Sequence, residues 1–252
     1  MKTYTAQPGS TLTLDNLGER TTVNLYSEEG FELLSNLWIK AATERRMMYE
    51  VNWLGRPVIQ FPNDIVVMQE LGWELKPDLI IECGVAHGGS LVLFASILEL
   101  LGEGRVIGVD VEIRTHNRKA LDEHFLRHRI ELIEGSSVAS DTFEAVRKSS
   151  ENAKRVIVVL DSNHSTEHVR RELELYCTLV TPESYLIAQD GAQAWVWEIP
   201  RGKPDWKDDN PLAAIMAFLA EHPEFAVDDR RTRFGITSSP KGYLRRLPTS
   251  PR

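Results

Sequence analysis

Apolar and polar residues alternate along this chain in blocks that predict strands and helices in turn. Short continuous apolar runs, typical of strands buried on both faces, lie at about residues 79–83, 105–109, 130–133, 155–160 and 184–188. Helical spacing of apolar positions follows at about residues 89–101, 115–124, 139–149, 166–176 and 211–221. This alternation predicts an α/β fold: a Rossmann-like, mostly parallel sheet with right-handed crossovers and helices on both faces.

The two ends of the chain add to this plan. Two runs near the C-terminus, 224–229 and 242–247, predict strands that close a seven-stranded sheet in antiparallel fashion. Upstream, helical spacing predicts one helix from Ser27 towards Val51 and another over 63–75, with Asn63 as its N-cap. We therefore expect a helical N-terminal extension, 1–62, that covers the site and mediates homo-oligomerisation, and a main domain, 63–252.

Composition narrows the class of protein. The 252 residues are 42% hydrophobic and 26% charged, with a net charge of −8, as in an ordinary globular protein. No basic block and no long apolar run is present in the sequence, so we expect neither a nucleic-acid nor a membrane partner. Two cysteines cannot form a disulfide framework, so we expect reduced thiols and a cytoplasmic location.

The first predicted strand leads into a glycine loop. The segment reads E-x-G-x-x-x-G-G-S from Glu82 to Ser90, which differs from the dinucleotide spacing G-x-G-x-x-G. Such a strand, turn and helix start places backbone N–H groups against a nucleotide-like ligand. A carboxylate at Glu82 would repel a pyrophosphate but suits the ammonium and sulfonium of S-adenosylmethionine (SAM). The residues expected to contact this cofactor are Glu82, Gly84, Val85, Ala86, Gly88 and Ser90.

Further acids follow the other predicted strands, and ligands in such sheets bind at the carboxyl ends of strands. Asp110 ends the second strand, where a carboxylate accepts hydrogen bonds from ribose hydroxyls. Ser136 and Ser137 follow the third strand, where the adenine is expected. Asp161 follows the fourth, Asp190 the fifth, and both lie at the same edge of the sheet.

These acids also suggest a metal and a base. Asp161, Gln189 and Asp190 form an all-oxygen set that suits Mg²⁺. His164, three residues after Asp161, is placed to remove a proton from a hydroxyl substrate. His168 lies one helical turn further and is interpreted as structural. The tryptophan-containing segment 191–210 is too long for an ordinary connection and predicts a lid or substrate wall.

Taken together, these segments resemble the bacterial cephalosporin hydroxylase family, over roughly residues 25–247. The resemblance is carried by residues 53–60, 82–90, 109–110, 160–164 and 189–190. It implies a class I SAM-dependent methyltransferase fold. A more remote likeness to catechol O-methyltransferase implies Mg²⁺ at Asp161, Gln189 and Asp190, cofactor contact by Asp161 as well, and a base at His164. Gln189 departs from the acid expected there, and Ser136 stands where many relatives have an acid.

The sequence thus predicts a Mg²⁺-assisted O-methyltransferase for a small hydroxylated molecule, such as a sugar or a secondary metabolite. Three other functions stay open at this point: an iron and 2-oxoglutarate hydroxylase, a nicotinamide-dependent oxidoreductase, and a non-catalytic scaffold that keeps the cofactor fold. Iron oxygenases use two histidines and a carboxylate, and the strand-end set is short of nitrogen ligands. The glycine spacing and Glu82 argue against a nicotinamide cofactor.

Overall fold

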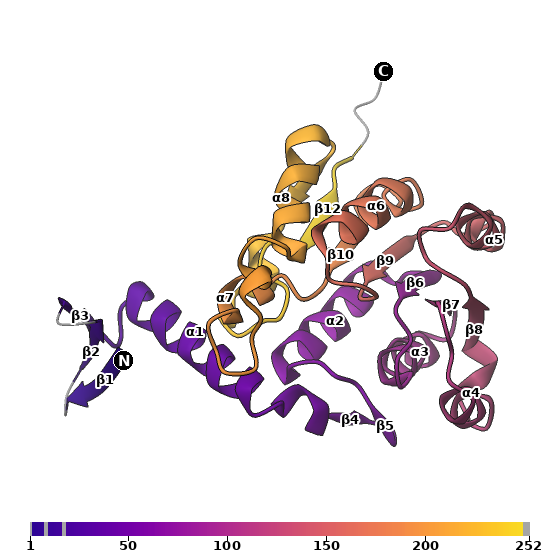
Figure 1. Cartoon of the computed structure of the whole chain (residues 1–252). Coiled ribbons are helices and arrows are strands. Elements are labelled where there is room, and N and C mark those ends of the chain that lie inside the picture. The colour runs from indigo at the N-terminus through magenta and orange to yellow at the C-terminus, as the bar shows by residue number, and fades with distance from the viewer. Residues whose placement is uncertain (1, 8–9, 17–18, 249–252) are drawn as a thin grey trace.

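The computed structural model describes residues 2–7, 10–16 and 19–248. A seven-stranded sheet forms its centre, in the order β11-β12-β10-β9-β6-β7-β8 (Figure 1). Its strands are β6 (Leu79–Cys83), β7 (Arg105–Asp110), β8 (Ile130–Glu134), β9 (Val156–Leu160), β10 (Tyr185–Ala188), β11 (Phe225–Val227) and β12 (Tyr243–Arg246). β12 pairs antiparallel with both neighbours, whereas β6 to β10 pair in parallel. This confirms the predicted α/β fold class.

Helices cover both faces of the sheet because its central strands are apolar on both sides. Ile80 of β6 belongs to one core cluster, whereas Leu79 and Ile81 belong to the other. The first cluster packs under α2 (Pro62–Leu75), α3 (Gly89–Leu101) and α4 (Thr115–Asp122). The second packs under α5 (Ser140–Ser150), α6 (Thr166–Tyr176) and α8 (Pro211–Glu221). Figure 1 shows the two helical layers on opposite sides of the sheet.

The order of the strands places the site. The chain runs from β6 outwards through β7 to β8, then returns to the other side of β6 with β9. The switch in direction lies between β6 and β9, so the loops after these two strands diverge and leave room for a ligand. Glu82 pairs with Val159 across these strands, which puts the glycine loop beside the loop that carries Asp161.

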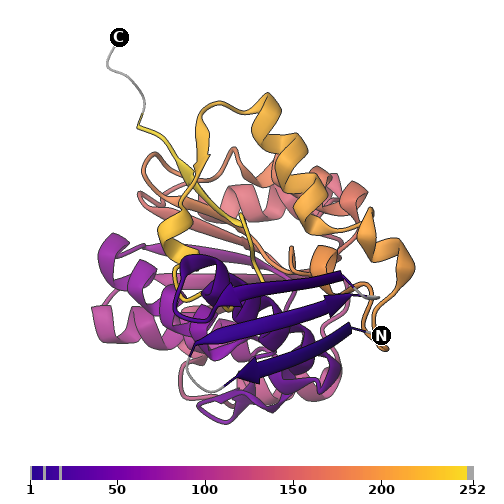
Figure 2. The same cartoon turned by 90° about the vertical axis from the view of Figure 1, so that its left-hand side faces the viewer.

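The N-terminal region differs from the expected helical extension. Three strands, β1 (Lys2–Gln7), β2 (Thr11–Asn16) and β3 (Glu19–Asn24), form a separate antiparallel sheet that stands in front of the body in Figure 2. Their threonine-rich alternation favours strands, and Leu12 and Val23, which face each other in the register, are both buried. Among the described residues that precede β4 (Asn52–Trp53) and β5 (Arg56–Pro57), only α1 (Glu28–Glu44) and a 3₁₀ turn, η1 (Met47–Glu50), are helical.

Of the two predicted helix starts, the structure confirms one and contradicts the other. The Ser27 hydroxyl accepts a hydrogen bond from the Gly30 N–H at 3.1 Å, which confirms the predicted start of α1. The prediction of Asn63 as N-cap of α2 is wrong: Phe61 holds that position and Pro62 is the first helical residue. Proline is favoured there because its missing N–H has no helical partner to lose.

Within the described residues, none of the helices combines the length and the apolar character that a membrane crossing requires.

Candidate functional site

The glycine loop after β6 is tightly packed against the loop after β9. Gly84 has φ +103°, and a Cβ on it would lie 2.0 Å from the backbone oxygen of Asp161. The Asp161 N–H donates to the Cys83 carbonyl at 2.7 Å, which ties the two loops together. Gly88, with φ +77°, is the N-cap of α3. Both positions need glycine, because the first has no room for a side chain and both are left-handed.

Glu82 lies fully buried at the base of this loop, 0% exposed. Its Oε2 accepts a hydrogen bond from the Ser90 hydroxyl at 2.8 Å, and its Oε1 has no partner among the described residues. Burial raises the pKa of Glu82 to about 8; the Ser90 hydrogen bond opposes this rise and the charge of Asp110 adds to it. An unpaired buried carboxylate oxygen is costly, so this atom is a candidate to receive a donor from a ligand.

Asp110 closes the loop from the end of β7. Its Oδ2 accepts hydrogen bonds from the backbone N–H groups of Val85 at 2.8 Å and Ala86 at 3.2 Å. Its Oδ1 accepts one from the backbone N–H of Glu112 at 3.2 Å. Asp110 also lines two cavities, of about 290 and 280 Å³. The second cavity is lined by Val109, Asp110, Val111, Ser136, Ser137, Ser162, Asn163 and His168. The structure therefore brings Asp110, Ser136 and Ser137 to one cavity.

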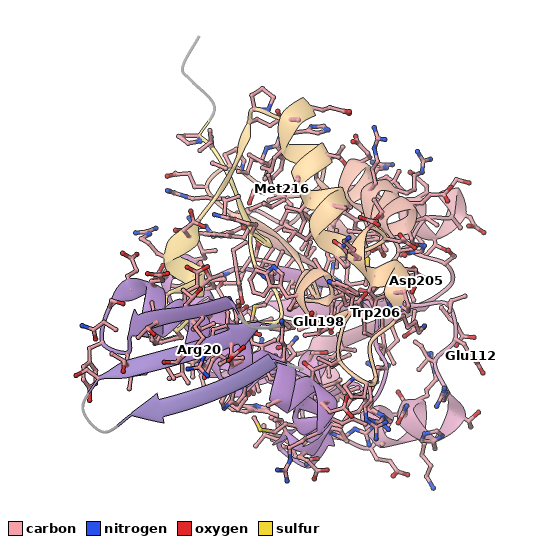
Figure 3. The ribbon with its side chains drawn as sticks, turned by 60° about the vertical axis from the view of Figure 1, so that its left-hand side comes forward. Arg20, Glu112, Glu198, Asp205, Trp206 and Met216 are labelled. Atoms are coloured by element: carbon pink, nitrogen blue, oxygen red, sulfur yellow. The ribbon has the colours of Figure 1, made fainter. Side chains whose placement is uncertain are left out.

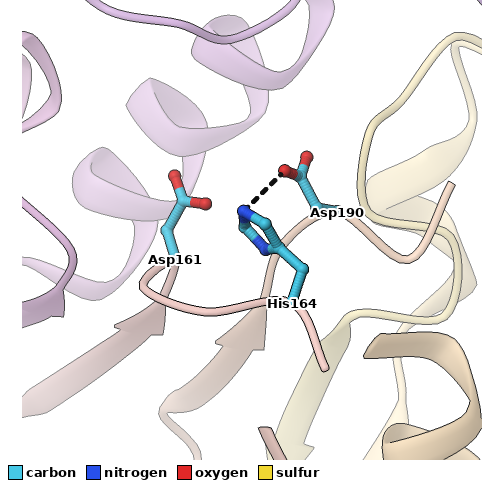
Figure 4. Close-up of side chains that lie close together, drawn as sticks. All are labelled: Asp161, His164 and Asp190. Carbon is cyan, nitrogen blue, oxygen red and sulfur yellow. Dashed lines mark ion pairs between the residues drawn. The ribbon is translucent and has the colours of Figure 1, made fainter. Parts of the chain in front are cut away.

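Asp161, His164 and Asp190 form a cluster at the edge of the sheet (Figure 4). One candidate ligand atom from each lies within 4.8 Å of the others, and His164 Nε2 is 3.3 Å from Asp190 Oδ2. All three side chains are partly exposed. Although the Asp161 side chain is partly exposed, desolvation by the surrounding protein and the neighbouring charge of Asp190 hold the pKa of its carboxyl group well above its usual range. A bound cation would stabilise two such neighbouring carboxylates, because its charge compensates their mutual repulsion.

Gln189 does not join this cluster, although the sequence placed it among the metal ligands. Its side chain is 2% exposed, and its Oε1 accepts from the hydroxyls of Ser238 and Ser239. Asp190 has left-handed backbone, φ +58°, so the chain turns sharply between the two residues. The hydrogen bonds from Ser238 and Ser239 hold the Gln189 side chain in the 237–239 loop. His164 takes the third place in the cluster.

A polar group that the sequence reasoning missed lies beside the cavity of about 280 Å³. His168 Nε2 is 3.1 Å from Ser162 Oγ, 3.2 Å from Ser137 Oγ and 3.4 Å from Glu172 Oε1. Glu172 is 0% exposed on α6, and its Oε1 accepts from Ser162 Oγ at 2.6 Å. The sequence carries a signal for this contact, because a histidine and a glutamate four residues apart on a helix are neighbours and Glu172 stands next to the buried Leu173.

The tryptophan-containing segment after β10 has structure of its own. It holds α7 (Gln193–Val196) and a 3₁₀ turn, η3 (Pro204–Lys207). Trp195 and Trp206 pack, partly buried, in a third apolar cluster with Ile39 of α1 and with Phe61. Figure 3 shows Glu198 beside one end of the N-terminal sheet, with Trp206 and Asp205 further from it. The segment therefore connects α1 to the main sheet instead of forming a bare loop.

Comparison with known proteins identifies the family. The sequence model of the Rhamnosyl O-methyltransferase/CmcI family matches residues 45–247. The chain belongs to this family. Rhamnosyl O-methyltransferase of Mycobacterium tuberculosis (strain ATCC 25618 / H37Rv) is 33% identical over 187 residues, covering 72% of each chain. Rhamnosyl O-methyltransferase of Mycobacterium leprae (strain TN) is 31% identical over 196 residues, covering 76% of this chain and 81% of its own.

Solved CmcI structures share the fold. An apo structure of CmcI superposes with a TM-score of 0.57 at 21% identity, covering 80% of this chain and 78% of its own. A CmcI structure with Mg and SAM gives 0.55 at 22% identity, covering 79% and 77%. Membership of the Rhamnosyl O-methyltransferase/CmcI family confirms the resemblance predicted from the sequence, and with it the enzyme class of an O-methyltransferase.

Proposed function

We propose that this member of the family transfers the methyl group of SAM to a hydroxyl of a small molecule, a sugar or a secondary metabolite, with the help of Mg²⁺. The observation that carries the proposal is the Asp161–His164–Asp190 cluster, tied to the glycine loop through Gly84. The rhamnosyl acceptor in the names of the relatives and the Mg and SAM in the CmcI structure support it.

The buried residues around the glycine loop fit the cofactor. The unpartnered Oε1 of Glu82 is an acceptor for the ammonium of the methionine moiety. We assign Asp110 to the two ribose hydroxyls, which it would accept in exchange for the loop N–H groups that it binds in the free protein. Those N–H groups of Val85 and Ala86 then become available to the cofactor. Gly84, Gly88 and Ser90 shape the loop that carries these contacts.

The cluster of Asp161, His164 and Asp190 fits a metal and a base. Mg²⁺ prefers oxygen ligands, so we assign Asp161 and Asp190 to the metal and the imidazole of His164 to proton transfer. When bound, the ion would lower the pKa of the acceptor hydroxyl. His164 accepts the hydroxyl proton, and the Asp190 carboxylate, 3.3 Å from its Nε2, stabilises the imidazolium that results. Methyl transfer would require the pocket to hold the acceptor oxygen in line with the methyl group.

The same donor set speaks against the hydroxylase alternative. Iron(II) oxygenases bind their metal through two histidines and one carboxylate with open positions. The cluster at the edge of the sheet has the opposite composition, one histidine and two aspartates. This composition favours the methyltransferase proposal.

A calorimetric titration of SAM, with and without Mg²⁺, tests the proposal. We expect binding in the micromolar range by the wild-type protein, about −8 kcal/mol. Glu82→Ala and Asp110→Ala should each lose it, because they remove the acceptors for the ammonium and the ribose. Glu134→Ala is the matched control, since Glu134 is an exposed acid at the end of neighbouring β8. No binding by the wild-type protein under either condition would overturn the proposal.

The raised pKa of Glu82 predicts an unusual pH dependence of stability. The folded protein holds this proton up to about pH 8, whereas an unfolded glutamate releases it near pH 4.3. Unfolding therefore releases a proton between these values, and the free energy of unfolding falls as pH rises through this window. Glu82→Gln should remove that part of the slope and make the ligand-free protein more stable than wild type at pH 7 to about 8.

Thermal unfolding midpoints between about pH 5 and 8 measure this effect. Asp64, whose pKa burial raises to about 6, contributes a slope of the same sign, so the dependence should weaken without vanishing. Glu134→Gln should retain the wild-type slope. An unchanged slope in Glu82→Gln would show that Glu82 is ionised in the folded protein.

A further inference from the structure

A buried carboxylate, that of Asp64 in the first turn of α2, holds the loop of residues 237–239. Its Oδ1 accepts a hydrogen bond from the Thr237 hydroxyl at 2.6 Å, and its Oδ2 accepts one from the backbone N–H of Ser238 at 2.8 Å. The Ser238 hydroxyl lies 3.1 Å from Oδ2, and the Tyr243 hydroxyl lies 3.4 Å from Oδ1. An acid is buried at low cost only where such donors replace the lost water. This side chain therefore fixes the loop to the start of α2.

The same loop holds the turn that carries Asp190. The backbone carbonyl of Ser238 accepts a hydrogen bond from the Ala192 N–H at 3.0 Å, on the C-terminal side of Asp190. On the N-terminal side, the hydroxyls of Ser238 and Ser239 hold the Gln189 side chain. Both flanks of the turn are thus tied to a loop that is itself fixed to α2.

Asp190 needs such support because its backbone is left-handed, with φ +58°. This conformation is uncommon for a residue other than glycine, and it persists where the surrounding structure imposes it. We infer that Asp64 is the positioning residue for Asp190: through the 237–239 loop it keeps the Asp190 carboxylate in the cluster with His164. Asp190 Oδ2 lies 3.3 Å from His164 Nε2 in this conformation. The inference rests on the proposed function, since it takes Asp190 as a ligand of Mg²⁺.

Two substitutions of Asp64 separate its role as an acceptor from its role as packing. Asp64→Leu keeps a side chain of similar size but leaves the Ser238 N–H without a partner. We expect the loop to move in this variant, because an unpaired buried donor is costly. Asp64→Asn should restore the wild-type behaviour, because its oxygen can accept from the Ser238 N–H. Its amide group then faces the hydroxyls of Thr237 and Tyr243, which can also accept hydrogen bonds.

Three quantities are measured for each variant: amide hydrogen exchange over residues 188–194, and the dissociation constants of S-adenosylhomocysteine and of Mg²⁺ by calorimetry. In Asp64→Leu the exchange should be faster, because the Ala192 N–H loses its acceptor in the loop. The Mg²⁺ constant, measured with S-adenosylhomocysteine bound, should rise by roughly tenfold or more, as for other groups that orient metal ligands. The S-adenosylhomocysteine constant should change by less than about threefold. The reason is that Glu82 and Asp110 belong to β6 and β7, which β9 separates from β10.

Asp78→Leu is the matched control. Asp78 also accepts hydrogen bonds from two backbone N–H groups of a distant segment, those of Lys154 and Arg155, at 2.7 Å each. It does so at the amino end of β6, opposite the edge that carries Asp190. Asp78→Leu should destabilise the protein and leave both the exchange over 188–194 and the Mg²⁺ constant as in wild type.

A second pair of variants approaches the same contact from the loop, should Asp64→Leu fail to fold. Thr237→Val removes the hydroxyl that donates to Asp64, and Thr237→Ser keeps it. We expect Thr237→Val to change the exchange and the Mg²⁺ constant in the same direction as Asp64→Leu, and Thr237→Ser to keep the wild-type values. Far-ultraviolet circular dichroism and the thermal midpoint check that each variant is folded.

The outcomes separate the inference from the proposed function. If the wild-type protein binds neither Mg²⁺ nor S-adenosylhomocysteine, the proposed function fails, and the exchange over 188–194 still decides whether Asp64 holds the Asp190 turn. If the wild-type protein binds both but folded Asp64→Leu or Thr237→Val keeps its exchange and its Mg²⁺ constant, the inference is overturned and the proposed function stands. Loss of both ligands with faster exchange throughout the main sheet also overturns it, because that pattern shows a general structural role.

Discussion

Replacing Asp161 with asparagine is expected to remove the Mg²⁺ dependence of methyl transfer and to lower kcat by roughly 10²–10³-fold. Asparagine keeps the size of the side chain and removes the charge that the metal requires. The same substitution should raise the thermal midpoint of the metal-free protein. Desolvation and the charge of Asp190 disfavour the charged form of Asp161 and raise its pKa, and a neutral amide avoids that penalty.

Opposite changes in activity and stability are the signature of a residue kept for function. The measurement is turnover at several Mg²⁺ concentrations, together with thermal unfolding with and without Mg²⁺. Mg²⁺ should stabilise the wild-type protein by mass action and leave Asp161→Asn unchanged. Asp122→Asn is the control, since Asp122 is an exposed acid on α4 paired with Arg127. Mg²⁺-dependent turnover that survives in Asp161→Asn would sink the metal assignment.

Gly84→Ala is expected to destabilise the protein by about 3–5 kcal/mol, the range reserved for severe local conflicts. The added Cβ would lie 2.0 Å from the backbone oxygen of Asp161, and backbone on both sides leaves no flexible side chain to yield. The left-handed φ of +103° adds a strain of roughly 1 kcal/mol. Because the displaced partner is the loop that carries Asp161 and His164, any folded fraction should also lose cofactor binding.

Gly102→Ala separates the steric effect from the backbone strain. Gly102 has a similar φ, +86°, but a Cβ there has nothing within 4 Å, so only about 1 kcal/mol is expected. Urea denaturation monitored by circular dichroism measures both variants. Equal destabilisation of the two would mean that the glycine loop and the Asp161 loop do not approach as closely as the structure has them.

The main sheet was predictable because its signal is local and strong. Each central strand is a short apolar run with a polar residue near or just beyond its carboxyl end, as in Leu79–Cys83 and Val156–Leu160, and burial on both faces produces such runs. The carboxyl ends of parallel strands share one edge, which is why the sequence alone groups Asp110, Asp161 and Asp190.

The N-terminal sheet was not predictable in the same way. Its residues are polar and threonine-rich, and its apolar partners, such as Leu12 and Val23, meet only when β2 and β3 pair. Strand propensity is weak when pairing across strands decides the outcome. The clear helical spacing of α1 led to the prediction of a helical extension that included these strands.

The sequence alone determined the family, the fold class and the set of strand-end carboxylates, because buried apolar runs and the glycine loop are encoded residue by residue. Tertiary structure alone decided which side chains meet. It turned Gln189 towards Ser238 and Ser239, put His164 beside Asp190, and joined Glu172 through Ser162 to His168. The physical reason is that hydrogen bonds and charge pairs depend on ångström-scale distances and on backbone turns, such as the left-handed one at Asp190, that spacing along the chain does not specify.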